Sequence, residues 1–189
     1  DFGTDAVRWY LMREMPTGAD ASYTPERFIT RYEELANVLG NLASRATSMI
    51  VKYRDGVVPD GPDSGLAGPI EETLSLTRDA MARLKVHDAL GAAMDLARTA
   101  NGYVEDRQPW AQAKDPDGAA ALDETLASLA RVLTVLAALF QPVCPSKTAE
   151  LADRLGLDGV PSLDRSVSIP LSGRTVRKGS PLFPRVDVG

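Results

Sequence analysis

The chain has 189 residues, of which 44% are hydrophobic and 25% charged, as is usual for one globular domain with or without a tail. Its net charge of −5 argues against a general nucleic-acid binder, because such proteins are basic. No segment approaches about 18 uncharged apolar residues, so we expect no membrane-spanning helix. With one cysteine, Cys144, and one histidine, His87, the chain can form neither an internal disulfide nor a Cys/His zinc site, and we expect no metal.

The sequence opens Asp1-Phe2-Gly3, without an initiator methionine or a basic, apolar leader. We therefore expect no secretory signal, and we interpret the chain as a piece of a longer protein. The lack of disulfides is consistent with a reducing compartment, so we expect the cytoplasm.

Helix signals begin at the N-terminus. Thr4 is expected to cap a first helix over residues 5–15, which Pro16-Thr17-Gly18 stops. Thr24 and Pro25 are a second start signal, a hydroxyl at the N-cap followed by proline at the first helical position. The next helix has the clearest pattern, with apolar residues spaced alternately by four and three over about eight turns. This stripe comprises Phe28, Tyr32, Leu35, Leu39, Leu42, Ala46, Met49 and Tyr53.

Three more long helices are predicted, over residues 69–85, 86–106 and 119–140. Their expected buried faces are, in chain order, Ile70, Leu74 and Met81; Leu90, Met94, Ala97 and Val104; and Leu122, Leu126, Leu129, Leu133, Leu136 and Phe140.

A short helix over residues 145–155 is expected to end with Gly156 at its C′ position. From Val160 on, four prolines predict an extended strap that lies on the bundle, with a small hairpin at Ser172-Gly173. The sequence as a whole predicts an all-α protein, an antiparallel bundle of about five helices with an extended C-terminal tail.

Few residues have a catalytic pattern. His87 is interpreted as a surface or capping residue beside Asp88, and Cys144 lies between prolines with no histidine near it in sequence. A hydrolase that uses both remains an alternative without a spatial argument. There is no glycine-rich phosphate loop, so the residues alone indicate a helical binding module.

One polar stripe is more informative. Asn37, Asn41, Arg45 and Ser48 recur at i, i+4, i+8 and i+11 on the long helix, beside its apolar stripe. Asparagine and arginine carry the donors and acceptors that suit the edge of an unpaired base. The plainer alternative is a polar face hydrogen-bonded to other helices.

Pro109-Trp110 interrupts the helical pattern after residue 106. A tryptophan behind a proline can present its ring to stack on an unpaired base, or it can pack over the end of the bundle. The residues do not separate these two interpretations.

Several blocks also resemble a known family, in the family's order. They are Phe2-Gly3-Thr4-Asp5-Ala6-Val7-Arg8-Trp9-Tyr10-Leu11-Met12-Arg13-Glu14, Leu35-Ala36-Asn37-Val38-Leu39-Gly40-Asn41-Leu42-Ala43-Ser44-Arg45, Asp55-Gly56-Val57-Val58-Pro59, Asn101-Gly102-Tyr103, Pro109-Trp110-Ala111-Gln112-Ala113-Lys114, Pro142 to Leu157, and Pro181-Leu182-Phe183-Pro184-Arg185-Val186. Together they resemble the C-terminal, α-helical anticodon-binding domain of methionyl-tRNA synthetases, which are class I aminoacyl-tRNA synthetases. Arg31-Tyr32-Glu33-Glu34-Leu35 departs from the family, since it lacks an asparagine and is one residue short, so Glu33 and Glu34 are not assigned by analogy.

The resemblance implies roles for the matched positions. Asn41 and Arg45 would hydrogen-bond bases of the CAU anticodon of tRNA(Met), and Trp110 would stack on one of them; Asn37 and Ser48 share the stripe and are added to the site. We expect Asn41, Arg45 and Trp110 to converge on one exposed patch, with Arg45 held by a nearby acceptor.

The resemblance also implies a division of the chain. Residues 1–23 would lead from a catalytic domain that lies outside this sequence, residues 24–157 would form the anticodon-binding bundle, and residues 158–189 the tail. The parent would be a ligase that attaches methionine to tRNA using ATP, with that catalytic domain as a second partner. This chain has no catalytic motif, so we expect it to hold no cofactor and to be inactive alone. The alternative is a non-catalytic helical protein-interaction module.

Overall fold

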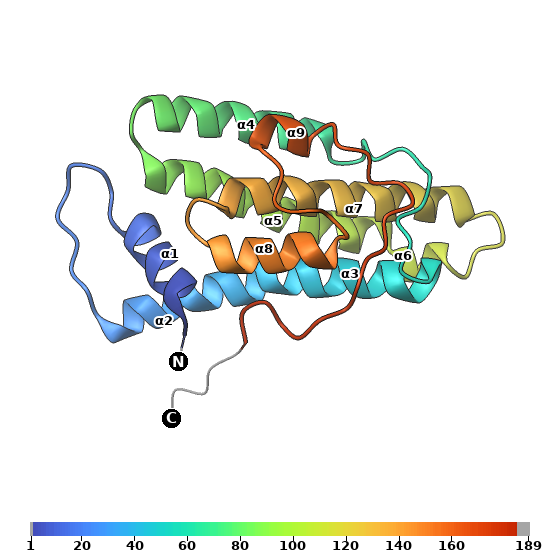
Figure 1. The fold of residues 1–189 in the computed structure, drawn as a ribbon, viewed down its shortest axis with the longest axis horizontal. Coiled ribbons are helices and arrows are strands. Elements are labelled where there is room, and N and C mark those ends of the chain that lie inside the picture. Colours follow the sequence, from blue (N-terminus) through green and yellow to red (C-terminus); the bar gives the residue numbers. More distant parts are fainter. Residues whose placement is uncertain (1, 185–189) are drawn as a thin grey trace.

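The structure of the protein is a computed structural model, which describes residues 2–184, and those residues form an all-α fold, as predicted (Figure 1). The helices are α1 (Thr4–Glu14), α2 (Pro25–Glu34), the π-helix η1 (Leu35–Gly40), α3 (Asn41–Arg54), α4 (Ala67–Ala82), α5 (Val86–Arg107), α6 (Pro109–Gln112), α7 (Ala119–Phe140), α8 (Pro145–Arg154) and α9 (Leu163–Ser166). Arg185 and Val186, at the end of the last family-like block, lie outside the described residues.

Helix α7 is the centre of the bundle. It contacts α3, α5, α8 and α9, and it is buried around nearly its whole circumference (Figure 1). The sequence explains this placement, because a helix that is apolar on every side is stable only when it is surrounded. Its predicted bounds and its predicted buried face are both confirmed.

The predicted long helix is continuous but irregular. Thr24 caps it as expected, with Oγ1 accepting from the Arg27 amide at 3.3 Å. Residues 35–40 then form a π-helix, whose wider turn holds about one extra residue and rotates the rest of the helix by about 100°. Leu42 and Ala46 are still buried as predicted, and the buried face widens to include Thr47 and Ile50. Met49 and Tyr53, predicted as core, are only half-buried.

Other local predictions need correction. Thr4 lies inside α1 and makes no side-chain cap, because the chain enters through Gly3. Met81, predicted on the buried face of α4, is 48% exposed near the end of that helix. Neither change affects which helices form the bundle.

The tail follows the bundle as a strap, but its details differ from the prediction. Residues 163–166 form the short helix α9, and no hairpin forms at Ser172-Gly173. Thr175 instead makes an antiparallel bridge with Val57, in the loop after α3. The nearly buried Arg131 of α7 fixes the strap, donating to the carbonyls of Ser166 and Ile169, each at 2.9 Å.

Because α7 is the centre of the core, truncating its fully buried side chains should weaken the whole fold. Leu126→Ala or Leu133→Ala is expected to lower the free energy of unfolding by about 2–5 kcal/mol. Chemical denaturation followed by circular dichroism measures this change. Losses under about 1 kcal/mol at both positions would show that α7 is not central.

Candidate functional site

The predicted polar stripe lies on the π-helix and α3, and two of its side chains contact α5. The Asn41 side chain donates from Nδ2 to Oδ1 of Asn101 at 3.4 Å, and Arg45 Nη2 bonds Glu105 Oε1 at 2.6 Å. Each partner lies 60 residues further along the chain, so the two helices run parallel and in register here. The expected acceptor for Arg45 is therefore Glu105.

Asn101 also connects α5 to the π-helix. Its Nδ2 donates to the Val38 carbonyl at 3.1 Å and to the Ala97 carbonyl of its own helix at 2.9 Å. Asn101 thus holds both the irregular turn and the amide of Asn41.

Beside this contact is a recess of about 600 Å³ between the π-helix, α3 and the tail. Asn37, Asn41 and Ser44 line one side of it. Pro181, Phe183 and Pro184 of the tail line the other, and the sequence stripe did not include Ser44. The recess presents amide and hydroxyl groups next to apolar rings, a combination that suits a flat heterocycle.

Ser48 lies further along α3, and Trp110 lies on α6, just beyond the end of α5. Gln108 takes a left-handed conformation with φ 48°, which ends α5 and starts α6 at the buried Pro109. Trp110 comes next with 39% of its surface exposed, five residues beyond Glu105. Ser48 is half-buried, three residues after Arg45 on α3. The convergence of Trp110 with Asn41 and Arg45 stays a prediction.

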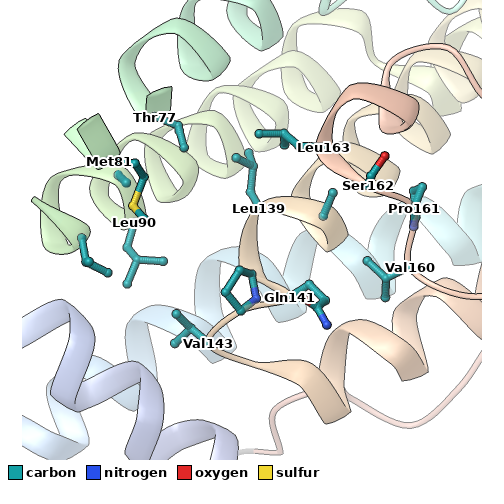
Figure 2. A pocket seen from close by; sticks show the side chains of 14 residues that line it. Thr77, Met81, Leu90, Leu139, Gln141, Val143, Val160, Pro161, Ser162 and Leu163 are labelled. Atoms are coloured by element: carbon teal, nitrogen blue, oxygen red, sulfur yellow. The ribbon is translucent and has the colours of Figure 1, made fainter. Parts of the chain in front are cut away.

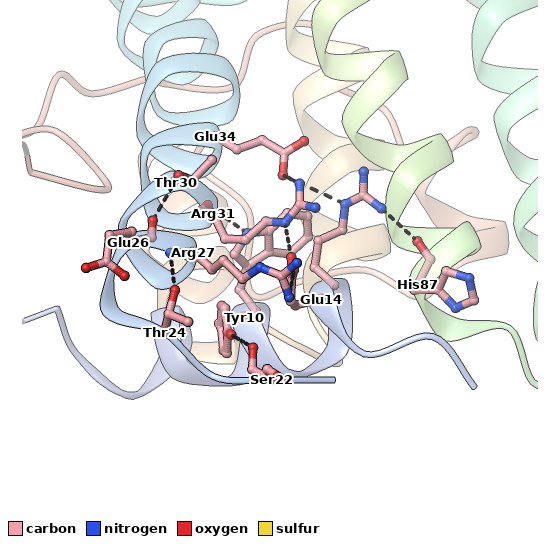
Figure 3. Close-up of polar contacts among 12 residues, drawn as sticks. Tyr10, Glu14, Ser22, Thr24, Glu26, Arg27, Thr30, Arg31, Glu34 and His87 are labelled. Atoms are coloured by element: carbon pink, nitrogen blue, oxygen red, sulfur yellow. Dashed lines mark hydrogen bonds and ion pairs between the residues drawn. The ribbon is translucent and has the colours of Figure 1, made fainter. Parts of the chain in front are cut away.

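The contact between the helix of residues 25–54 and α5 forms a seam. A network of arginines and carboxylates lies at the end of this seam away from Trp110, where α1, α2 and α5 meet (Figure 3). The Glu14 carboxylate forms salt bridges with Arg27 at 3.4 Å and with Arg31 at 2.7 Å. The Glu34 carboxylate forms salt bridges with Arg31 at 3.2 Å and with Arg98 at 2.6 Å. Although partial burial opposes the shift, these two carboxylates raise the pKa of the Arg31 guanidinium.

An apolar cavity of about 490 Å³ lies elsewhere, between α4, α5, the end of α7 and the chain before α9 (Figure 2). Leu90, Leu139, Val143 and Leu163 are among its lining residues, and Met81 is near its rim. The polar groups in its lining are the hydroxyls of Thr77 and Ser162 and the amide of Gln141. None of these is an acid or base, so the cavity has no group for proton transfer.

The structure gives no support to a hydrolase. Cys144 is fully buried, and its Sγ donates to the Asp5 carbonyl at 3.8 Å. Burial, reinforced by the charge of Asp5, raises the pKa of the Cys144 thiol to about 12. The polar partner of His87 is its neighbour Asp88, whose Oδ1 lies 3.1 Å from His87 Nε2. Between residues 2 and 184, no group of His, Cys, Asp and Glu side chains is placed to hold a metal, and no helix has the length and apolar character needed to cross a membrane.

The partners on α5 and the arginine network were not predicted from the sequence. Asn101 and Glu105 repeat the four-residue spacing of Asn41 and Arg45, which is a weak signal for two helices that pair in register. Glu34 and Arg98 have no comparable signal, because their contact joins residues 64 positions apart.

Comparisons with known proteins relate the chain to methionine–tRNA ligases. A family model described as tRNA synthetases class I (M) matches residues 1–47. Methionine–tRNA ligases from Halalkalibacterium halodurans and Lactococcus lactis are each 37% identical over 99% of this chain. The apo structure of Mycobacterium tuberculosis methionyl-tRNA synthetase superimposes on 96% of the chain with a TM-score of 0.88 and 34% identity, and its complex with methionyl-adenylate on 97%, with a TM-score of 0.89 and 33% identity.

The chain is similar throughout to one part of methionine–tRNA ligases. It spans 30% of the length of the two curated ligases, and 39% and 38% of the two solved chains. The likeness therefore extends over this chain from end to end, but over less than half of each relative.

The state of Cys144 can be tested directly. Because its pKa is raised to about 12, the native thiol should not react with a disulfide reagent near pH 8, whereas the unfolded chain should react at once. The release of the coloured thiolate measures both rates. Rapid labelling of the native protein would show that Cys144 is accessible and ionised.

Proposed function

We propose that this chain is the tRNA-binding part of a methionine–tRNA ligase and that its α3–α5 face recognises the CAU anticodon. The observation that carries the proposal is the register of α3 and α5, which aligns Asn41 and Arg45 one turn apart beside Asn101 and Glu105. The similarity to methionine–tRNA ligases supports the same assignment.

Asn41 and Arg45 keep hydrogen-bonding capacity for a ligand. Asn41 is exposed, and only one of its amide hydrogens is directed to Asn101, so its oxygen and its second hydrogen remain for a base edge. The Arg45 side chain is 29% exposed and is held through Nη2, which leaves other donors of its fork. Asn37 and Ser48 extend this face on either side.

Trp110 supplies a stacking surface in the proposal. Buried Pro109 fixes the backbone before it, while the indole is partly exposed beside the end of α5. Stacking tolerates any base, so it contributes affinity, whereas the amide and guanidinium groups contribute the choice of base. The acidic character of the chain, with a net charge of −5, limits unspecific binding of RNA.

The second proposed partner is the catalytic domain of the same longer protein, which would bind ATP and act in the cytoplasm. Residues 1–23 are the part of the chain proposed to contact it. Val7 and Leu11 on α1 and Met15 just after it follow one another at intervals of four residues and are each at least 40% exposed. Leu11, Tyr23 and Ile29 also border an apolar groove of about 810 Å³ between α1 and α2. Exposed apolar patches of this kind mark interfaces, and the class I family model matches this region.

A protein-interaction module is the alternative function. The apolar groove between α1 and α2 would suit a protein partner, whereas the α3–α5 face is lined by amides, a guanidinium and hydroxyls. These polar groups favour a ligand that offers hydrogen bonds, which an unpaired anticodon does.

The stacking role of Trp110 gives a direct test. Trp110→Ala should weaken binding of a CAU anticodon stem-loop by about 1–3 kcal/mol, because one stacked base loses its platform. Fluorescence anisotropy with labelled RNA measures the affinity. Trp110→Phe is the matched control, since it keeps an aromatic ring and should retain most of the binding. Equal affinities for all three proteins would contradict the proposal.

The α1 interface is tested in the intact parent. Leu11→Glu should lower aminoacylation by disturbing the contact between domains, while ATP-dependent activation of methionine without tRNA stays near its original rate. Leu76→Glu is the control, because Leu76 is 51% exposed on α4, away from α1. If the two variants aminoacylate equally, the α1 face is not the interface.

A further inference from the structure

The arginine network described above is layered. The side chains of Glu14 and Glu34 are only 12% and 11% exposed, so these carboxylates lie beneath the surface. The arginines that bind them face outward: the side chains of Arg27 and Arg98 are 54% and 46% exposed, and that of Arg31 is 30% exposed. Among these paired groups the guanidinium groups are therefore the more exposed charges, although the chain as a whole is acidic.

This surface continues the seam of the proposed anticodon site. Arg98, Asn101 and Glu105 lie on one side of α5, and each contacts the helix formed by residues 25–54. Seven helical residues separate Arg98 from Glu105, which is about 10 Å along the axis. A nucleotide held at Arg45 thus has its neighbouring backbone within reach of the arginine layer.

We propose that Arg27, Arg31 and Arg98 bind backbone phosphates of the RNA strand whose anticodon bases lie at Asn41 and Arg45. This inference rests on the proposed function and adds the phosphate-binding residues to it. Contacts to phosphates set the position and register of a nucleic acid, while contacts to base edges select its sequence.

The chemistry of the layer suits a phosphate. Arginine offers a fork of five donors, and the carboxylates beneath use only some of them, so the remaining N–H groups are held in fixed orientations. Arg98, for example, gives Nη2 to Glu34 and Nη1 to Asp95 at 2.5 Å. Asp95 is itself 73% exposed and lies one turn before Arg98, away from Glu105. With Arg13, which contacts Glu34 at 3.8 Å, the ion pairs of this network join four arginines to three carboxylates, an excess of one positive charge within the network itself.

A network with a purely structural role could have the same layers, but its arginines would not contribute to the salt dependence of RNA binding. The two cases differ in salt dependence, because each phosphate neutralised by a cation releases bound counterions. For single-stranded RNA the slope of log K against log salt changes by about 0.7 for each phosphate that the protein no longer neutralises.

The experiment uses the 189-residue chain. It compares the Arg98→Gln variant with the unsubstituted chain in binding a CAU anticodon stem-loop across a salt series. We expect weaker binding at low salt, a log–log slope smaller by about 0.7, and an unchanged preference for CAU over a scrambled anticodon. Arg27→Gln, at the most exposed of the three arginines, should give the same signature. Arg78→Gln is the matched control, because Arg78 is 59% exposed on α4 and pairs with Asp164 away from the seam.

Two results overturn different statements. Binding that prefers CAU but keeps its full salt slope in both Arg98→Gln and Arg27→Gln refutes the phosphate site and leaves the anticodon site intact. If the unsubstituted chain binds RNA stem-loops without any preference for CAU, the proposed function itself is refuted. Circular dichroism of each variant establishes that it is folded before the slopes are compared.

Discussion

The pairing of α3 with α5 is the constraint on which the polar face depends. Asn101 bonds the carbonyl of Val38 and the amide of Asn41 at the same time, so it joins the π turn, the start of α3 and the middle of α5. Without the π turn, the residues after Gly40 would be rotated by about 100°, and a different set of side chains would face α5. The position of Arg45 beside Glu105 is thus a consequence of one irregular turn upstream.

That irregular turn is sustained by its surroundings. Gly40 packs against Phe183 of the tail, where a Cβ would lie 3.5 Å from the ring, and Leu35 and Leu39 are buried in the core. The tail is in turn fixed to α7 through Arg131 and to the loop after α3 through Thr175. Since α7 is buried on nearly every side, the rest of the bundle packs around it, and the polar face is supported by the hydrophobic core.

How much the sequence foretells depends on the range of the interaction. The bounds of α7 and the Thr24 cap are local properties, and both were predicted correctly. The stripe from Phe28 to Ala46 is also correct, whereas Met49 and Tyr53 at its end are only half-buried, after a π turn that no local signal marks. The bridge between Val57 and Thr175 and the contact of Glu34 with Arg98 join distant positions, and a single sequence does not show such pairings. The stripe of Asn41 and Arg45 could be found because it is periodic, whereas its partners on α5 became evident only in three dimensions.

In the proposed complex, the distribution of charge would let an acidic chain bind RNA selectively. Spread over the surface, a net charge of −5 repels phosphates at long range and lowers the affinity for arbitrary RNA. Buried Glu14 and Glu34 reverse this locally, because they hold arginines outward at one end of the α3–α5 seam while contributing little negative surface themselves. An RNA gains from those arginines only when its backbone lies along the seam, and in the proposed complex that placement also brings its bases to Asn41, Arg45 and Trp110. Under this proposal affinity is coupled to correct placement, and such coupling would discriminate against RNAs whose bases do not fit the site.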